Sequence, residues 1–284
     1  MIVFPNCKIN LGLHVIRKRD DGYHDLETVF YPLPLRDALE VVRPEAGGRK
    51  SEAGSQTLDV RNVDFHMSGL IVNGKPEDNL CIKAYDLLKK DFPQLPAIQM
   101  HLHKAIPMGA GLGGGSSDGA FTLQLLNEKF QLNISREQLL DYALRLGSDC
   151  PFFIINKPCI ATGRGELMQA VSLDLSSYSF LLVHPGIHVN TGWAFSQLTP
   201  AVPPQSLTAI IQQPVTNWPS LLKNDFEMSV LQHHPELKVL KEKLYEAGAL
   251  YASMSGSGSC FYGIFSKGNV PDLAWPDNYK VFAC

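Results

Sequence analysis

The sequence predicts a protein of two domains that mixes strands with helices, and three observations support this. The chain has 284 residues, enough to bury a large core and more typical of two domains than of one. A glycine-rich stretch lies between a segment that alternates like a strand and a segment with helical periodicity. Beyond about Pro158 a new series of strands and helices begins.

Composition narrows the class of protein. With 45% hydrophobic residues, 19% charged residues and a net charge of -3, the chain has the composition of an ordinary soluble protein. Its basic triplet at 17–19 runs directly into two aspartates, so we expect no nucleic-acid partner. No apolar run has the length of a membrane span and the start lacks a signal peptide, which predicts a cytoplasmic protein with no membrane partner. Its six cysteines lack C-x-x-C spacing and are interpreted as reduced thiols.

The first predicted strand covers residues 8–16 and carries two polar side chains on one face. Apolar residues at every second position leave Lys8 and Asn10 side by side on the opposite face. Such a face is most often solvated, but Gly12 within the strand indicates close approach of a ligand or another backbone. A hairpin follows, with Tyr23 and His24 just beyond its tip. By residue type alone, these two are a packed aromatic residue and a turn histidine.

The remaining elements follow from periodicity and turn residues. Before the glycine-rich stretch we predict strands at 38–42, 64–70 and 98–103, a helix at 79–90, a surface loop at 44–56 and a turn at 73–74. After it we predict helices at 120–126, with Ser116, Ser117 and Asp118 as N-caps, and at 136–146, between a capping box from Ser135 and Gly147. The second half predicts strands at 180–183, 250–254 and 260–265, a short helix capped by Thr191, and a helix at 235–247.

The stretch from Pro107 to Gly119 carries the strongest chemical signal. Six of its thirteen residues are glycine. Without a Cβ atom the backbone can adopt positive φ, and its N–H groups can approach a ligand closely. Because a helix follows, its positive end points at whatever the loop binds, and phosphate is the obvious candidate. The patterned elements on both sides argue against a flexible linker.

Two familiar nucleotide motifs fit this stretch poorly. Gly109, Gly111 and Gly114 match the dinucleotide fingerprint, but a second helix follows where that fold needs a strand ending in an acid. The Walker A pattern is absent, because no Lys-Ser or Lys-Thr follows the glycines. A dinucleotide-dependent oxidoreductase and a non-catalytic nucleotide binder remain as alternatives. Asp149, at a helix end and before an apolar run expected to be a strand, is either a cap or turn residue or an active-site carboxylate.

Five motifs span nearly the whole chain: 5–11 (Pro-Asn-Cys-Lys-Ile-Asn-Leu), 21–24 (Asp-Gly-Tyr-His), 107–119, 146–153 (Leu-Gly-Ser-Asp-Cys-Pro-Phe-Phe) and 254–258 (Met-Ser-Gly-Ser-Gly). Together they resemble the superfamily of small-molecule kinases named for galactokinase, homoserine kinase, mevalonate kinase and phosphomevalonate kinase. The second and third are similar to the branch that phosphorylates a cytidyl-bearing alcohol of the non-mevalonate isoprenoid pathway. Cys7 and Gly119 stand where that family commonly has alanine, and Ser259-Cys260 also departs from it.

The resemblance implies an α+β fold with an active site in the cleft between two domains. The N-terminal domain, at 1–157, is expected to be similar to domain 2 of ribosomal protein S5. The C-terminal domain, at 158–284, is expected to be ferredoxin-like. Another kinase of the superfamily, acting on mevalonate-like or amino-acid alcohols, is the closest alternative, and it needs no cytosine pocket. Oligomeric state stays open.

The resemblance also implies roles for individual residues. Asp149 is expected to take the proton of the 2-hydroxyl of the substrate while Lys8 steadies charge. The ATP-binding residues implied are Asn79, Lys104, Pro107, Met108, Gly109, Ala110, Gly111, Leu112, Gly113, Gly114, Gly115, Ser116 and Ser117. Mg²⁺ is expected with ATP, and its ligands stay open, with Ser117 as a candidate.

For the substrate, the resemblance implies a cytosine held between two aromatic rings. Tyr23 and Phe195 are expected to sandwich the base, while His24 reads its hydrogen-bonding edge. Trp193 is close enough to Phe195 to compete for that role. The other substrate-binding residues implied are Asn10 and Thr191, and the turn that contains Gly256 and Gly258 has an open role.

Overall fold

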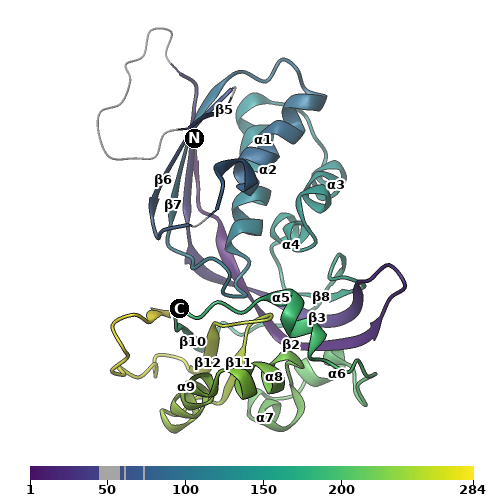
Figure 1. Ribbon diagram of the computed structural model, residues 1–284, viewed down its shortest axis with the longest axis vertical. Helices are drawn as coiled ribbons and strands as arrows, with labels where there is room; N and C mark the ends of the chain where they lie inside the picture. The colour runs from purple at the N-terminus through teal and green to yellow at the C-terminus, as the bar shows by residue number, and fades with distance from the viewer. Residues whose placement is uncertain (45–57, 61, 73) are drawn as a thin grey trace. The chain divides into compact units, whose positions relative to one another are not determined.

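The protein forms two compact units, seen in a computed structural model that describes residues 1–44, 58–60, 62–72 and 74–284 (Figure 1). Unit 1 comprises Met1–Cys7, Leu35–Ile106 and Gly114–Asn156. Unit 2 comprises Lys8–Pro34, Pro107–Gly113 and Lys157–Cys284. Both units contain strands and helices, as the α+β prediction requires. The loop expected at 44–56 and residue 73 of the predicted turn lie outside the described residues, apart from Pro44.

The two units are not separated by a single boundary in the sequence. The expected domains meet at 157/158, yet unit 2 also takes residues 8–34 and 107–113. The cause is a four-stranded sheet with the order β2-β3-β8-β9. Its strands are β2 (Asn6–Lys18), β3 (His24–Arg36), β8 (Cys159–Thr162) and β9 (Leu167–Ala170). Because β3 pairs antiparallel with β8, the hydrogen-bond ladder ties the first strands of the chain to residues beyond 157.

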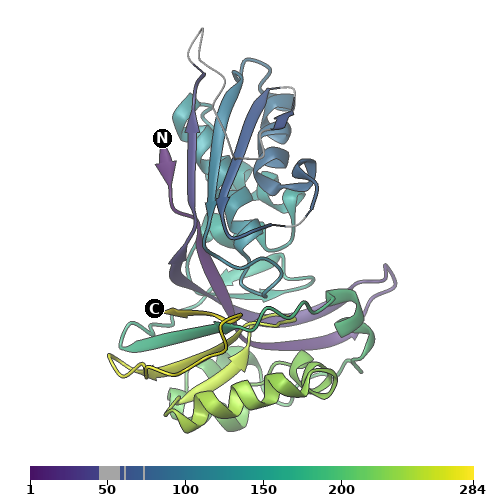
Figure 2. The same ribbon diagram turned by 60° about the vertical axis from the view of Figure 1, so that its left-hand side comes forward.

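Unit 1 is a five-stranded sheet covered by helices. The sheet has the order β1-β4-β7-β6-β5, formed by β1 (Ile2–Val3), β4 (Ala38–Val42), β7 (Ile98–Lys104), β6 (Val63–Gly69) and β5 (Leu58–Val60). Only the β6 and β7 pair is parallel among these described strands. Figures 1 and 2 show α1 (Leu80–Asp91) and α2 (Gly114–Phe130) on one face of it, with α3 (Arg136–Leu146) and α4 (Cys150–Ile155) beyond. A short 3-10 helix, η1 (Pro76–Asp78), precedes α1.

Unit 2 adds a second sheet and most of the short helices. The sheet has the order β11-β12-β10-β13, formed by β11 (Tyr251–Met254), β12 (Phe261–Ser266), β10 (Tyr178–His184) and β13 (Lys280–Ala283), all antiparallel. The helices are α5 (Thr191–Ser196), α6 (Leu207–Ile211), η2 (Val215–Asn217), α7 (Trp218–Leu221), α8 (Phe226–His233) and α9 (Pro235–Glu246). Buried side chains of α8 and α9, including Val230, Leu237 and Leu244, join Val183 and Phe261 of the sheet in one core.

Most predicted elements are present, and three details of the prediction are wrong. The helix at 136–146 and its capping box are confirmed. The apolar run after Asp149 is the helix α4 and not a strand, because Pro151 stands in its first turn, where proline favours a helix start. The helix α2 begins at Gly114, so Ser116, Ser117 and Asp118 lie inside it and are not N-caps. The cap of α5 is Asn190, whose Oδ1 accepts from the Trp193 N–H at 2.8 Å, and not Thr191.

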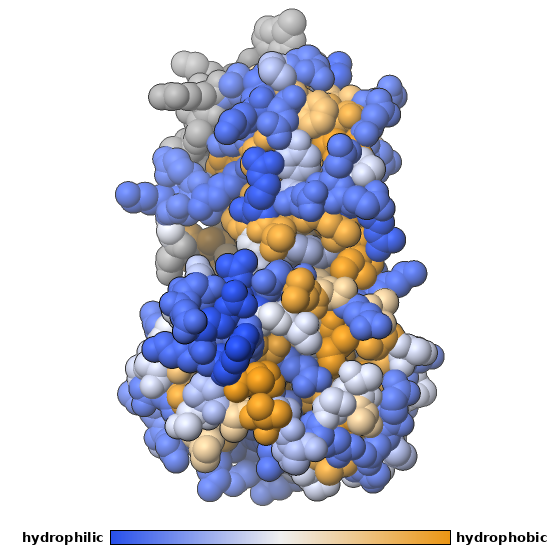
Figure 3. All heavy atoms as spheres, turned by 90° about the vertical axis from the view of Figure 1, so that its right-hand side faces the viewer, coloured by the Kyte–Doolittle hydropathy of each residue, from blue (hydrophilic) through white to orange (hydrophobic). Residues whose placement is uncertain are grey.

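The hairpin between β2 and β3 projects as a charged ribbon. Arg17 and Arg19 form ion pairs with Asp25, and Arg19 also with Asp21. Figure 3 looks onto the side from which this hairpin projects in Figure 1 and shows a strongly hydrophilic cluster there. Within the described parts of the chain, no helix combines the length and the apolar character that crossing a membrane requires.

Candidate active site

The glycine-rich segment adopts the backbone that its composition predicts. Gly109, Gly111 and Gly113 have φ values of 65°, 78° and 70°, in the left-handed region that favours glycine. The chain then enters α2 directly at Gly114. The first N–H groups of a helix lack partners within it, so this end of α2 suits an anion. We call residues 107–113 the phosphate loop.

A second glycine segment, Ser255–Ser259, holds the phosphate loop in place; we call it the glycine turn. The Ser255 Oγ–H donates to the Gly111 carbonyl at 2.8 Å, and the Cys260 N–H just after the turn donates to the Ala110 carbonyl at 3.2 Å. The Lys8 N–H donates to the Leu112 carbonyl at 3.0 Å. Three successive carbonyl oxygens of the loop are therefore bound to the protein, and these are the groups that would repel a phosphate.

The fit between the two segments explains one glycine of the loop. A Cβ atom at Gly111 would lie 1.9 Å from the Ser255 carbonyl oxygen, closer than any real contact. At Gly109 it would meet only the His188 ring, at 3.4 Å. Both positions need positive φ, but only Gly111 is also required by close approach of another backbone.

Lys8 and Asn10 lie on a buried face of β2, so the solvated face that is usual for such residues is excluded here. Lys8 is 4% exposed, and its Nζ donates to the Asn10 Oδ1 at 2.6 Å and lies 4.8 Å from the Phe30 ring centroid. The Asn10 Nδ2 donates to the Thr28 Oγ1 at 2.9 Å. This network fixes the position of the Lys8 ammonium relative to β3.

Gly12, on the same strand, has positive φ, and the atoms nearest to a Cβ built on it belong to side chains. A Cβ atom there would meet the side chains of Leu222 and Leu207 at 2.7 and 2.8 Å. The glycine in this strand is therefore explained by its positive φ and by the close packing of these two apolar side chains.

Unit 1 contains a buried charge cluster beneath the start of α2. The Lys104 side chain is 1% exposed and donates to the carboxylates of Asp37 and, at 2.7 Å, Asp118. The Asp37 Oδ1 also accepts from the N–H groups of Ala105 and Ile106 at 2.6 and 2.8 Å. A Cβ atom on Gly114 would lie 3.3 Å from the Lys104 Nζ, so the ammonium packs directly under the first residue of α2.

One ammonium cannot neutralise two buried carboxylates, and the titration of the cluster reflects this. Desolvation raises the pKa of Asp118 to about 8, although the positive charge of Lys104 opposes the shift. Burial works against the charge on Lys104, but the two carboxylates raise its pKa overall. The cluster therefore holds a charged lysine and one carboxyl group that binds a proton readily.

Two oxygen atoms at this end of α2 are candidates for a metal ion. Among the described residues, the buried Ser117 Oγ and Asp118 Oδ1 have no hydrogen-bond partner. Mg²⁺ prefers such oxygen ligands, and around ATP it needs only one or two from the protein. The described residues contain no group of three His, Cys, Asp or Glu side chains that could bind a metal on its own. The oxygens thus fit an ion held mainly by phosphates.

Asp149 and Asn79 each stand at the start of a helix in unit 1, but only the Asn79 side chain makes a capping hydrogen bond. Asp149 occupies the cap position of α4 but makes no capping hydrogen bond with its side chain. Asn79, expected near the nucleotide, caps α1: its Oδ1 accepts from the Cys81 N–H at 2.9 Å. The interpretation of Asp149 as an ordinary cap is therefore unsupported, while Asn79 has a clear structural role.

The residues expected at the base divide into two groups. His24 stacks on Phe195 with 4.7 Å between ring centroids and 15° between planes, whereas Trp193 contacts His233 at 4.6 Å. Tyr23 is 57% exposed, and its ring lies 5.0 Å from the Arg164 guanidinium carbon. The structure thus brings His24 and Phe195 together and leaves Tyr23 against a cation.

Thr191 was also expected at the substrate, and the protonation of His24 bears on its expected role there. Thr191 shares a hydrogen bond of 2.9 Å between its Oγ1 and the Ser257 Oγ of the glycine turn. Partial burial lowers the pKa of His24, which favours the neutral ring, with one donor and one acceptor nitrogen. Such a ring can read the edge of a base.

Sequence reasoning missed two positions. Asp37 gave only a weak signal, an isolated acid between two predicted strands. The run from 224 to 227, Asn-Asp-Phe-Glu, precedes and opens α8 with cap-type residues, a signal that was available. Both turn out to be hydrogen-bonding centres of their units.

Comparisons with known proteins define the class. Residues 79–157 match the family model described as the GHMP kinases N terminal domain, and residues 207–274 match that of the GHMP kinases C terminal region. A solved structure of a mevalonate kinase shares the fold, with a TM-score of 0.61, 11% identity and coverage of 100% of this chain and 98% of that one. The fold is thus that of the GHMP kinases.

Closer relatives carry one name. A 4-diphosphocytidyl-2-C-methyl-D-erythritol kinase of Bacteroides thetaiotaomicron is 49% identical over 99% of this chain and 98% of the relative. One of Cytophaga hutchinsonii is 45% identical over 100% and 98%. A crystal structure of a 4-(cytidine 5'-diphospho)-2C-methyl-D-erythritol kinase has a TM-score of 0.75 and 30% identity, covering 93% of this chain and 90% of that one. This chain belongs to the 4-diphosphocytidyl-2-C-methyl-D-erythritol kinase family.

Proposed function

We propose that this chain transfers the γ-phosphoryl group of ATP to the 2-hydroxyl of 4-diphosphocytidyl-2-C-methyl-D-erythritol, in the methylerythritol phosphate route to isoprenoid precursors. The observation that carries the proposal is the phosphate loop, whose left-handed glycines lead straight into the first turn of α2. This is the arrangement that binds phosphate through backbone N–H groups. The 49% identical relative of that name supports the choice of substrate.

In this proposal the phosphate loop and the first residues of α2, from Pro107 to Ser117, bind the ATP phosphates. The buried ammonium of Lys104 lies under Gly114, where its ion pairs with Asp37 and Asp118 support the start of α2. The unpartnered oxygens of Ser117 and Asp118 would hold Mg²⁺, and the ion would offset phosphate charge. Asn79 contributes indirectly, through the start of α1.

The protein's part in phosphoryl transfer is positioning and electrostatics, with one group to orient the nucleophile. We assign that group to Asp149, which stands at the start of α4, two residues after Gly147 ends α3. It accepts the proton of the attacking hydroxyl. Lys8, whose ammonium is fixed by Asn10, stabilises the negative charge that develops during transfer.

The cytosine is assigned to the ring pair of His24 and Phe195. The base stacks on the Phe195 ring, and the neutral His24 ring forms hydrogen bonds with the edge of the base. Tyr23 lies near Arg164 and completes the sandwich as the second ring, with Asn10 and Thr191 binding polar groups of the substrate. The net charge of -3 fits a cytoplasmic enzyme with small-molecule partners and no nucleic-acid or membrane partner.

The test is to incubate the purified chain with ATP, Mg²⁺ and 4-diphosphocytidyl-2-C-methyl-D-erythritol, and to follow ADP release and the phosphorylated product. Parallel reactions contain homoserine, mevalonate or a nicotinamide dinucleotide. We expect product only with the cytidyl substrate. Turnover of mevalonate or homoserine in its place would support another GHMP kinase activity, and ATP binding without any turnover would support a non-catalytic nucleotide binder.

A further inference from the structure

A short segment of unit 2, Lys223–Asp225, lies between β2 and the glycine turn. The Leu13 N–H donates to the Lys223 carbonyl, and the Asp225 N–H donates to the Leu13 carbonyl, both at 2.9 Å. Asn224 forms an isolated parallel bridge with Leu13. The segment is therefore fixed to the strand that carries Lys8 and Asn10.

The Asn224 side chain reaches from this segment to the glycine turn. It is buried, and its Nδ2 donates to the carbonyls of Met254 and Gly256, each at 2.8 Å. Its Oδ1 accepts from the Phe226 N–H at 3.0 Å. The two hydrogens of the Asn224 side-chain amide thus bind the carbonyls of Met254 and Gly256. These two bonds set the direction in which the chain enters the turn.

The turn transmits that geometry to the phosphate loop. Gly256 has φ +57°, and a Cβ atom on it would lie 3.3 Å from the Gly111 Cα. Its neighbour Ser255 donates to the Gly111 carbonyl and accepts from the Asn10 N–H at 3.2 Å. One residue, Asn224, therefore holds a turn that contacts the phosphate loop and the backbone of Asn10.

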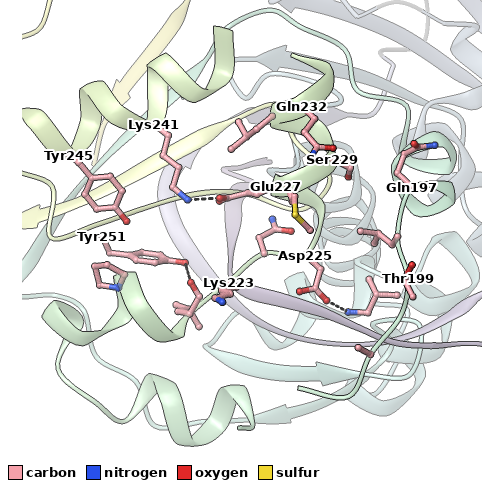
Figure 4. A pocket seen from close by; sticks show the side chains of 18 residues that line it. Gln197, Thr199, Lys223, Asp225, Glu227, Ser229, Gln232, Lys241, Tyr245 and Tyr251 are labelled. Carbon is pink, nitrogen blue, oxygen red and sulfur yellow. Dashed lines mark hydrogen bonds and ion pairs between the residues drawn. The ribbon is translucent and has the colours of Figure 1, made fainter. Parts of the chain in front are cut away.

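The neighbours of Asn224 bind other elements. The Asp225 carboxylate accepts from the Val15 N–H at 2.8 Å and contacts His14. The Glu227 Oε1 accepts from the Met254 N–H at 2.7 Å, and its Oε2 is paired with Lys241. Side chains of this run also line a cavity of about 670 Å³ (Figure 4). The Asn224 side chain differs from these two in that it donates to the carbonyl of Gly256, within the turn itself.

We propose that Asn224 is a positioning residue for ATP binding: it orients the glycine turn against which the phosphate loop is held. This inference rests on the proposed function, because it takes the loop as the ATP site. Without the amide, the carbonyls of Met254, just before the turn, and of Gly256, within it, lose this donor, and the loop loses a fixed support. ATP affinity should therefore fall, while affinity for the cytidyl substrate should stay nearly constant.

The experiment compares Asn224→Ala with Asn217→Ala, a matched control in which an exposed asparagine donates to the Gln213 Oε1 at 3.3 Å. Calorimetric titration with a non-hydrolysable ATP analogue, well below the melting temperature, should show the Kd rising about tenfold in Asn224→Ala and staying within about twofold in the control. The Kd for the cytidyl substrate should move less than about threefold in both. Equal losses for both ligands, or an unchanged ATP Kd, would overturn the proposal.

A double variant tests whether Asn224 acts through the turn. Ser255→Ala alone removes the next hydrogen bond toward Gly111. If both act through the turn, Asn224→Ala with Ser255→Ala should raise the ATP Kd little beyond the larger single effect. If the increases in ATP Kd of the two single variants multiplied in the double variant, the two residues would act independently and Asn224 would not act through the turn. Should Asn224→Ala fail to fold, Asn224→Asp replaces it, since it keeps the size and the acceptor for Phe226.

A measurement on the unmodified chain covers the case in which both variants unfold. Saturation with the ATP analogue should slow hydrogen exchange at the Cys260 amide, which joins turn and loop, and leave the Gly248 amide at the end of α9 unchanged. Unchanged exchange at Cys260 would overturn the proposal. A wild-type chain that does not bind the analogue would instead overturn the proposed function.

Discussion

The two units hold their candidate site residues by different forces. In unit 1, the start of α2 rests on a buried cluster of charges, in which Lys104 lies between Asp37 and Asp118. In unit 2, the phosphate loop is held by neutral groups: a serine hydroxyl and backbone amides donate to three of its carbonyls. The start of α2 is thus supported by ion pairs, and the phosphate loop by shape and backbone hydrogen bonds.

This difference shows which perturbations each part should resist. A charged cluster depends on protonation, so a substitution that keeps the shape but removes a charge should affect it strongly. A neutral hydrogen-bonded contact depends on geometry, so an added methyl group should be enough to disturb it. Substitutions of each kind can therefore test the comparison.

The largest effect is expected from a charge change in unit 1. Asp149→Asn keeps the shape of the side chain but cannot accept a proton. If Asp149 is the general base, kcat should fall by about 10² to 10⁴, while both Kd values and the melting temperature change little. Single-turnover phosphorylation and calorimetry on one preparation measure all of these. Full turnover in the variant would remove Asp149 from the mechanism.

The second effect is expected from a shape change in unit 2. Gly111→Ala places a Cβ atom against the Ser255 carbonyl oxygen, whereas Gly109→Ala meets only the His188 ring, and both carry positive φ. Gly111→Ala should disrupt two or three hydrogen bonds between loop and turn and raise the ATP Kd about 100-fold. Gly109→Ala should show only the cost of positive φ, about 1 to 2 kcal/mol in stability. Similar ATP affinities in the two variants would show that the turn does not support the loop.

A third, smaller effect should separate two aromatic candidates in unit 2. Phe195 stacks with His24, while Trp193 contacts His233, and we expect Phe195 to be the base platform. Stacking on a base contributes about 1 to 3 kcal/mol, and Phe195→Ala should weaken cytidyl substrate binding about five-fold to a hundred-fold. Trp193→Ala is the control and should have little effect on that Kd. The reverse result would assign the base to Trp193.

The phosphate loop was predictable from sequence because its chemistry is local. Glycine content alone predicts positive φ, and Gly109, Gly111 and Gly113 adopt it. Periodicity likewise placed the helix at 136–146, whose capping box is a contact between near neighbours in sequence. Where periodicity is ambiguous, as in the short apolar run after Asp149, the prediction of a strand was wrong and a helix formed.

Contacts between distant residues were not predictable. No local pattern shows that Gly111 meets Ser255, 144 residues away, or that Asn10 lies on Thr28. The cluster around Lys104 joins β7, α2 and the link between β3 and β4, and nothing in the sequence shows that Asp37, Lys104 and Asp118 meet. Helix α2 also begins earlier than predicted. Glycine has a poor helix propensity, which favours a later start, but the packing of Gly114 over Ile106 and Lys104 overrides that preference.

The smallest effect concerns pH and should distinguish the charged cluster from the neutral one. The pKa of Asp118 is about 8 in the folded chain, against its ordinary value of 3.8, because the carboxyl group is buried. Between these values the folded chain binds more protons than the unfolded chain. The free energy of unfolding should therefore fall as pH rises from about 4 to about 8 and then level off, with a contribution of about 1 kcal/mol between pH 6 and 7.

Urea unfolding of the wild type and of Asp118→Asn across this range isolates the contribution, since other titrating groups are common to both chains. The difference between the two free energies should change with pH by up to about 1.4 kcal/mol per unit and become constant above about pH 8. Ser255→Ala, which alters the neutral contact in unit 2, should lower stability by the same amount at every pH, because no charge is involved. A pH-independent difference for Asp118→Asn would mean that Lys104 keeps both carboxylates ionised, and the two units would then respond to pH alike.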